Sequence, residues 1–187
     1  ELRQYFPLDK VLTQGVFAAA ERLYGISIIP REDLEGYAEG VRVSEVFDKD
    51  VEHKEQGEHG DKGIGLLLTD YFGRPTKRGG AWMSQFVGQS GLLERKPVIV
   101  NVLGITKPAD GSQPLLSLDE VHTLFHEFGH GLHHLLTRVD ELGVSGINGV
   151  EWDAVELPSQ FMENWCWEPE GLAGGGRKCV RGGISVL

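Results

Sequence analysis

The chain has 187 residues, of which 40% are hydrophobic and 25% charged, a composition typical of a folded globular domain and not of a disordered chain. Its 28 acidic and 18 basic residues give a formal net charge of −10, which argues against nucleic acid or an anionic membrane as a partner, because both bind basic surfaces. An apolar run of about 18 residues is absent from the sequence, so we expect no membrane-spanning helix. Two cysteines are too few for a disulfide framework, and a reducing, cytoplasmic location is expected.

The first half of the chain predicts one helix followed by strands. Apolar residues at helical spacing predict a helix over residues 8–24, which Gly25 ends. Short apolar and β-branched runs then predict strands at residues 26–29, 41–46, 64–69 and 97–103. The charged segment 48–61 is interpreted as a solvated loop, and its histidines, His53 and His59, as surface residues and not metal ligands.

The second half predicts two helices. Ser117 followed three residues later by Glu120 fits a capping box, which begins a helix with a wide apolar stripe that runs to about residue 138. A second helix is expected from about Ala154 to Trp165, with Pro158 tolerated only in its first turn. The order of helix, strands, helix and helix predicts the α+β class.

Histidines cluster in the first of these two helices. Five of the seven histidines lie between His122 and His134, four of them at a spacing of four residues. Only His126 is followed directly by a glutamate, Glu127, and its partner one turn later is His130. One interpretation of the cluster is a polar stripe of hydrogen-bonded histidines. The other is the H-E-x-x-H metal motif, of which a chain of this composition contains about 0.02 by chance.

The chemistry of this motif follows from helix geometry. Residues four apart project two imidazoles toward one metal ion, and the glutamate one step round from the first histidine serves as the general base. Bound zinc lowers the pKa of its water toward about 7. A catalytic zinc site needs a third protein ligand, and His133 and Leu136 occupy the places where the histidine-rich variant has Gly and His.

A downstream carboxylate is therefore expected as the third ligand. Glu156 is the preferred candidate, because Gln160 and Glu163 share its helix face and could orient the ligands from behind. A solvated carboxylate at a helix start is the alternative interpretation of Glu156. The remaining acidic candidates are Asp140, Glu141, Glu151, Asp153 and Glu163. A structural zinc site would instead need a fourth protein ligand such as His122 or His134.

Two segments together resemble a known family. Residues 126–134 and residues 152–165 resemble the two active-site motifs of the thimet oligopeptidase family of zinc peptidases, and Asp70 with residues 77–83 resembles the lead-in to that site. The resemblance covers about residues 4–172. It implies one zinc ion per chain, held by His126, His130 and Glu156, with Glu127 as general base.

The resemblance also implies a fold and a substrate class. It implies a zincin-like metallopeptidase core, made of a small sheet, the H-E-x-x-H helix and a glutamate-bearing helix, within a larger and mainly helical peptidase that is monomeric. It further implies endopeptidase cleavage of short peptides. Residues 1–170 are expected to form a partial catalytic domain, and the Gly-rich residues 171–187 a disordered or non-native tail. Because the family's downstream substrate-binding segment has no match here, we expect weak or no turnover from this chain alone.

Three smaller expectations concern packing. Gly79, Gly80 and Ala81, followed by Trp82, are the candidate edge strand that contacts the substrate backbone, since small residues permit close approach; a simple turn before a core tryptophan is the alternative. Lys77 and Arg78 are expected to be a solvated pair. Phe161, Trp165 and Trp167 are expected in the core. The leading function is a zinc-dependent oligopeptidase core, and the alternative is a non-catalytic zinc- or peptide-binding fragment.

Overall fold

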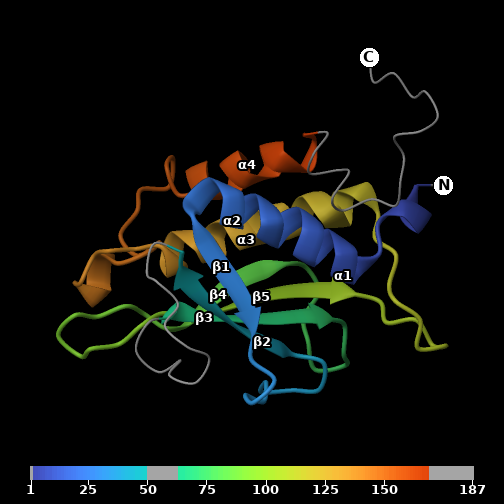
Figure 1. The fold of residues 1–187 in the computed structure, drawn as a ribbon, viewed down its shortest axis with the longest axis horizontal. Helices are drawn as coiled ribbons and strands as arrows, with labels where there is room; N and C mark the ends of the chain where they lie inside the picture. The colour runs from blue at the N-terminus through green and yellow to red at the C-terminus, as the bar shows by residue number, and fades with distance from the viewer. Residues whose placement is uncertain (1, 50–62, 169–187) are drawn as a thin grey trace.

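The fold is a mixed sheet with helices on one side, as Figure 1 shows. A computed structural model describes residues 2–49 and 63–168. The loop predicted at 48–61, with His53 and His59, and the tail predicted at 171–187 fall wholly or largely outside these residues. Within them, the small mixed sheet and few helices agree with the predicted α+β class.

The sheet has five strands in the order β1-β2-β3-β5-β4. The β3–β5 pair is parallel and the other neighbouring pairs are antiparallel. The four predicted strands are confirmed, and β3 extends beyond its predicted end. The bounds are β1 Ile26–Pro30, β2 Arg42–Asp48, β3 Gly63–Phe72, β4 Trp82–Val87 and β5 Val98–Ile105.

The first helical stretch matches its prediction over residues 8–24. It consists of α1 (Leu8–Lys10), a π-helical segment (Val11–Phe17) and α2 (Ala18–Tyr24) without a break. Gly25 follows with φ +64°, a left-handed conformation that glycine adopts without steric cost. The predicted stop signal is therefore the residue that ends the helix.

The two later helices differ in how closely they follow the sequence. Helix α3 (Leu118–Leu135) begins with the predicted capping box, in which the Glu120 amide donates to Ser117 Oγ at 3.2 Å and the Ser117 amide donates to Glu120 Oε2 at 2.7 Å. Helix α4 (Leu157–Glu163) begins three residues later than predicted, and a 3₁₀ turn at Asn164–Cys166 continues it. Pro158 then lies in its first turn, where a missing amide costs nothing.

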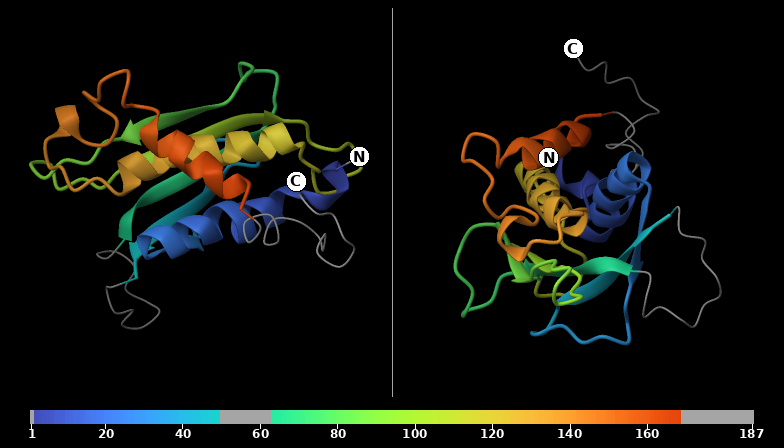
Figure 2. Two further views of the ribbon diagram at one scale, coloured as in Figure 1. Left: turned by 90° about the horizontal axis from the view of Figure 1, so that it is seen from above. Right: turned by 90° about the vertical axis from the view of Figure 1, so that its left-hand side faces the viewer.

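Alternating strand residues divide the apolar side chains into two layers. Ile99 and Leu103 of β5 belong to the main core under α3, whereas Val100 and Val102 belong to a smaller cluster on the opposite face. The right-hand view of Figure 2 places the helices on one side of the sheet. Helix α3 consequently rests on the sheet, and α4 packs on α3.

The aromatic residues of α4 depart from the prediction. Trp165 packs against the main core, but Phe161 and Trp167 are 46% and 55% exposed. Helix α4 is short and lies on α3 by one face only, and Met162 and Cys166 occupy that face. No helix in the described ranges 2–49 and 63–168 has the length and apolarity that a membrane span requires.

The segment between β3 and β4 corrects two further expectations. Residues 79–81 are not in a strand: Gly80 has φ +99°, the chain bends there, and the edge strand begins at Trp82. Lys77 is not solvated, because its side chain is 4% exposed and forms an ion pair with Asp70. Arg78 is exposed and stacks its guanidinium over the Trp82 ring at 4.2 Å.

Candidate metal centre

Helix α3 brings His126 and His130 together on its side toward α4. The two imidazoles are one turn apart, with ring centroids at 4.9 Å and ring planes at 84°. His130 is buried and His126 is partly buried. Burial lowers the pKa of His130, which favours the neutral imidazole that a metal ion requires.

Glu156 completes the group from the residue before α4. Its Oε2 lies 3.0 Å from His130 Nε2 and 3.4 Å from His126 Nε2. The Ser159 hydroxyl donates to the same oxygen at 2.8 Å, and this bond, together with the two imidazoles, lowers the pKa of Glu156. The ligand atoms of these three residues lie within 4.8 Å of one another, so the group could hold a metal ion.

Gly129 lets the two helices approach closely enough to form the group. A Cβ at this position would lie 2.6 Å from Ser159 Cα and 2.7 Å from the Pro158 carbonyl oxygen, distances at which backbone must move. A glycine is therefore required by packing and not by its φ. The sequence predicts no role for Gly129 or Ser159; their place in the two motif segments is the only signal for them.

Glu163 contacts the histidines from behind. Its Oε1 lies 2.6 Å from His126 Nδ1, and its Oε2 lies 3.3 Å from His122 Nε2. The Nδ1 contact leaves His126 Nε2 directed at Glu156. Gln160, the other residue expected to orient the ligands, is exposed on α4.

Glu127 lies on the sheet side of the same turn. Its carboxylate is buried and accepts a hydrogen bond from the backbone N–H of Met83 in β4. Burial raises the pKa of Glu127, and the neighbouring Glu156 adds to this rise, while His126 and the Met83 amide oppose it. The strand amide that holds Glu127 could not be identified from the sequence, because it depends on the pairing of helix and sheet.

The other candidate ligands lie outside the group. His122 contacts Glu163, and His134 is buried against Gly146 of the loop that follows α3. Among the described residues, neither histidine joins the cluster that could hold a metal ion. The same holds for Glu163, which lies behind the histidines, and for four acidic candidates that are exposed: Asp140, Glu141, Glu151 and Asp153.

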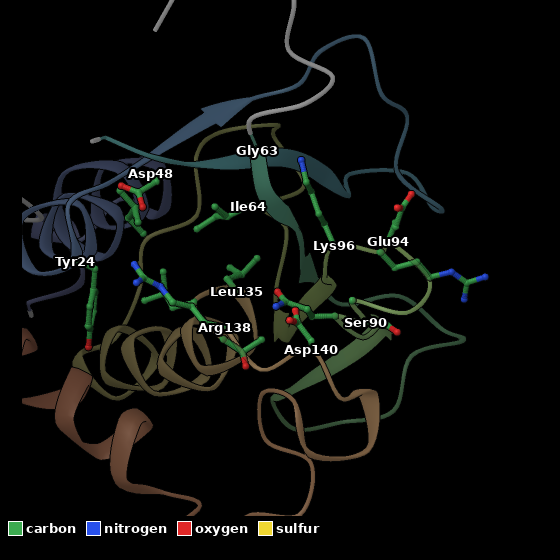
Figure 3. Close-up of a pocket in the computed structure, with 16 residues that line it drawn as sticks. Tyr24, Asp48, Gly63, Ile64, Ser90, Glu94, Lys96, Leu135, Arg138 and Asp140 are labelled. Atoms are coloured by element: carbon green, nitrogen blue, oxygen red, sulfur yellow. The ribbon is translucent and has the colours of Figure 1, made fainter. Parts of the chain in front are cut away.

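A separate hollow lies at the far end of α3. Figure 3 shows this pocket of about 700 Å³, lined by Leu135, Arg138 and Asp140 near the end of α3 and by Gly63 and Ile64 of β3. The residues that line it include none of the three that could hold a metal ion, His126, His130 and Glu156. The candidate metal centre is therefore not the pocket of Figure 3 but a group between α3 and α4.

An H-E-x-x-H helix that faces a carboxylate from a second helix is the arrangement of zinc-type metallopeptidases. The comparison with known sequences agrees: the description "Peptidase family M3" matches residues 1–176, and the chain belongs to this family. The resemblance to the thimet oligopeptidase family is thereby confirmed.

Individual relatives extend this result. The chain is 49% identical over 177 residues to oligopeptidase A of Escherichia coli (strain K12), 44% identical over 173 residues to dipeptidyl carboxypeptidase of the same strain, and 30% identical over 172 residues to a probable thimet oligopeptidase of Arabidopsis thaliana. These matches cover 92%, 92% and 90% of this chain but 24%, 24% and 22% of the relatives. The chain therefore spans about a quarter of the length of the curated relatives it matches.

Proposed function

We propose that this chain is the catalytic core of a zinc-dependent metalloendopeptidase that hydrolyses peptide bonds in short oligopeptides. The observation that carries the proposal is the convergence of His126 Nε2, His130 Nε2 and Glu156 Oε2. Two neutral imidazoles and one carboxylate are a donor set of catalytic zinc, which takes three protein ligands and keeps one position open. When bound, one zinc ion per chain would supply Lewis acidity toward a water molecule and the scissile carbonyl.

Glu127 is the proposed general base. Its carboxylate is adjacent in sequence to one ligand, and burial raises its pKa, which makes it a stronger base than an exposed glutamate. It would take the proton of the attacking water and deliver it to the amide nitrogen as the carbon–nitrogen bond breaks. The Met83 amide would hold the carboxylate in place during both transfers.

Glu163 is the proposed orienting partner of His126. A carboxylate at Nδ1 keeps the proton on that nitrogen, leaves the Nε2 lone pair for the metal ion and raises ligand basicity. Gln160 remains a second candidate for this role, although its exposure gives it less support.

The edge of the sheet is the proposed place for the substrate backbone. Strand β4 is the last strand in the order, and an edge strand can pair with an extended peptide. Gly79, Gly80 and Ala81 form the bend that leads into β4, and they are proposed to contact the peptide there. We also propose that the sheet, α3 and α4 form a zincin-like core.

We further propose that residues 1–170 are part of the catalytic domain of a longer, cytoplasmic and monomeric peptidase. The matched relatives are about four times longer than this chain, which supports weak or no turnover by the chain alone. The alternative function is a zinc- or peptide-binding fragment without catalysis, which the same metal group would also serve.

Zinc analysis combined with peptide cleavage tests the proposal. We expect one zinc per chain after dialysis, loss of zinc with a chelator, and less than one equivalent in His130→Ala. A short fluorogenic peptide should then be cleaved slowly or not at all by this chain. Any cleavage should disappear in Glu127→Gln, which keeps the three proposed ligands and should still bind zinc.

The outcomes separate the two functions. Zinc binding with Glu127-dependent cleavage supports the peptidase, whereas zinc binding without cleavage in this chain and in a version joined to the remainder of a relative supports the binding fragment. Failure to bind zinc would refute both. Turnover equal to that of a full-length relative would refute the expected weakness of the chain alone.

A further inference from the structure

A buried ionic cluster lies on the sheet face opposite α3. Asp70, near the end of β3, belongs to the strand face that carries Leu66 and Leu68 of the smaller apolar cluster. Its side chain is 3% exposed, yet it accepts four hydrogen bonds from three side chains. We define the Asp70 cluster as Asp70 with its partners Tyr37, Arg74 and Lys77.

The contacts of Lys77 tie the chain after β3 back onto that strand. Its Nζ lies 2.7 Å from the Asp70 carbonyl oxygen, 2.9 Å from Asp70 Oδ1 and 2.8 Å from the Phe72 carbonyl oxygen. An ammonium group has three donors, and all three are used here. Burial costs the Lys77 charge free energy, so this arrangement persists only because the acceptors converge on it.

Arg74 and Tyr37 complete the shell of the carboxylate. Arg74 donates to both Asp70 oxygens, at 2.7 and 2.8 Å, and the Tyr37 hydroxyl donates to Oδ2 at 2.7 Å. A bidentate guanidinium fixes orientation as well as charge. The cluster thus joins the β1–β2 connection, the end of β3 and the segment 73–81 at one carboxylate.

The cluster contacts β4 through Tyr37, and its sequence neighbour Arg78 makes a second contact. The Tyr37 ring packs edge-on against Phe86 at 5.4 Å, and Arg78, next to Lys77, stacks on Trp82 at 4.2 Å. Trp82 and Phe86 share one face of β4, and Met83 lies on the other face, toward the main core. Met83 is also the residue whose amide holds Glu127.

We infer that the Asp70 cluster positions the edge strand β4 and, through the Met83 amide, the carboxylate of Glu127. Among the described residues, β4 is an edge strand that pairs with β5 on one side only, so it depends on other contacts to keep its place. The cluster supplies them from the opposite face of the sheet. The inference rests on the proposed function only where it names Glu127 as the base.

Amide hydrogen exchange of this chain tests the inference. In Lys77→Met the amides of β4, with Met83 as the most informative, should exchange about tenfold faster or more, because local opening becomes easier. Amides of the β1–β2 pair should change by less than about twofold. The matched control is Lys107→Met, the same substitution in an exposed ion pair with Glu39, which should leave β4 unchanged.

Two further variants keep the result interpretable. Glu127→Ala removes the acceptor of the Met83 amide directly, so its effect on that amide sets the scale for Lys77→Met. Arg74→Met removes a side chain that is 31% exposed, so it should fold even if Lys77→Met does not, and should produce a smaller acceleration in β4. Zinc affinity should stay within about twofold in both cluster variants, because no cluster residue is a proposed ligand.

Unchanged β4 exchange in Lys77→Met, or in Arg74→Met where Lys77→Met does not fold, would overturn the inference. Equal acceleration of β4 and the β1–β2 pair would also overturn it, since the cluster would then contribute only to global stability. Zinc binding by the unmodified chain tests the proposed function separately. Its failure would leave the exchange result, and hence the positioning of β4, intact.

Discussion

Two carboxylates on opposite sides of the sheet have opposite surroundings. Asp70 is 3% exposed and enclosed by two cationic side chains and a hydroxyl, whereas Glu156 is 47% exposed and shares one oxygen among two imidazoles and Ser159. The first carboxylate has its partners within the protein, and the second belongs to a group of lone-pair donors that could hold a metal ion. A carboxylate whose partners are all protein groups stabilises the structure, whereas a half-exposed carboxylate beside two imidazoles can bind a ligand.

The largest effect should come from a change in the candidate metal group of His126, His130 and Glu156. Glu156→Gln keeps the shape of the side chain but removes its charge, and we expect zinc affinity to fall by more than about 100-fold, because two imidazoles alone hold zinc weakly. Competition with a chromophoric chelator measures this. The exposed Glu151→Gln is the control and should bind zinc as the unmodified chain does. Equal affinities of the two variants would exclude Glu156 as a ligand.

Gly129→Ala should disturb the candidate metal group through the packing of α4 on α3. The added methyl group meets the backbone of Ser159 and Pro158, so α4 must move away from α3 and carry Glu156 with it. We expect a loss of about 1–3 kcal/mol in unfolding free energy, together with weaker zinc binding. Denaturant titration and zinc competition measure the two effects. Gly143→Ala is the control, since a Cβ there meets no atom within 4 Å. A stable Gly129→Ala with unchanged zinc affinity would show that the helices need not approach so closely.

The Asp70 cluster should make the stability of the fold depend on pH. Burial by itself would raise the pKa of Asp70, but hydrogen bonds from Arg74, Tyr37 and Lys77 outweigh it and lower the pKa to about 2. In the unfolded chain the pKa of this carboxyl is about 4. Because the folded pKa is lower, ionisation of Asp70 stabilises the fold, and the full contribution is present above pH ~4. This contribution, about 2 kcal/mol, is lost as the pH falls from about 4 toward 2.

Comparison of the unmodified chain with Asp70→Asn isolates this contribution. The difference between their unfolding free energies should shrink by about 2 kcal/mol between pH 5 and pH 2. Asp9→Asn, in an exposed pair with Arg42, should differ from the unmodified chain by less than about 1 kcal/mol throughout. A pH-independent difference for Asp70→Asn would mean that the carboxyl is not ionised preferentially in the folded state.

Local patterns predicted most of the fold. The helix over 8–24 with its glycine stop, the capping box at Ser117 and four of the five strands follow from spacing over a few residues. Strand β4 was placed too early because both of its faces bear apolar and polar residues, so alternation could not mark where it begins. The exposure of Phe161 and Trp167 was missed because a short helix buries only the face that meets its neighbour.

Part of the site could be predicted from the sequence as well. His126, Glu127 and His130 lie within one turn and a half of a single helix, and Glu163 was expected beside them; the structure places it against His126 Nδ1. The burial of Lys77 could not be predicted from the sequence, although Arg74 and Lys77 follow the strand that carries Asp70. Their charges alone fit a solvated loop as well as a buried cluster.

By itself the sequence determined that two imidazoles and a glutamate share one helical turn, because a regular helix fixes the relation of residues four apart. The tertiary structure decided which of several distant carboxylates meets them, since that depends on the contact of α4 with α3 at Gly129. It also decided that the lysine after β3 lies buried and that a strand amide holds Glu127. These relations arise from packing between segments far apart in the chain, and the spacing of residues does not encode them.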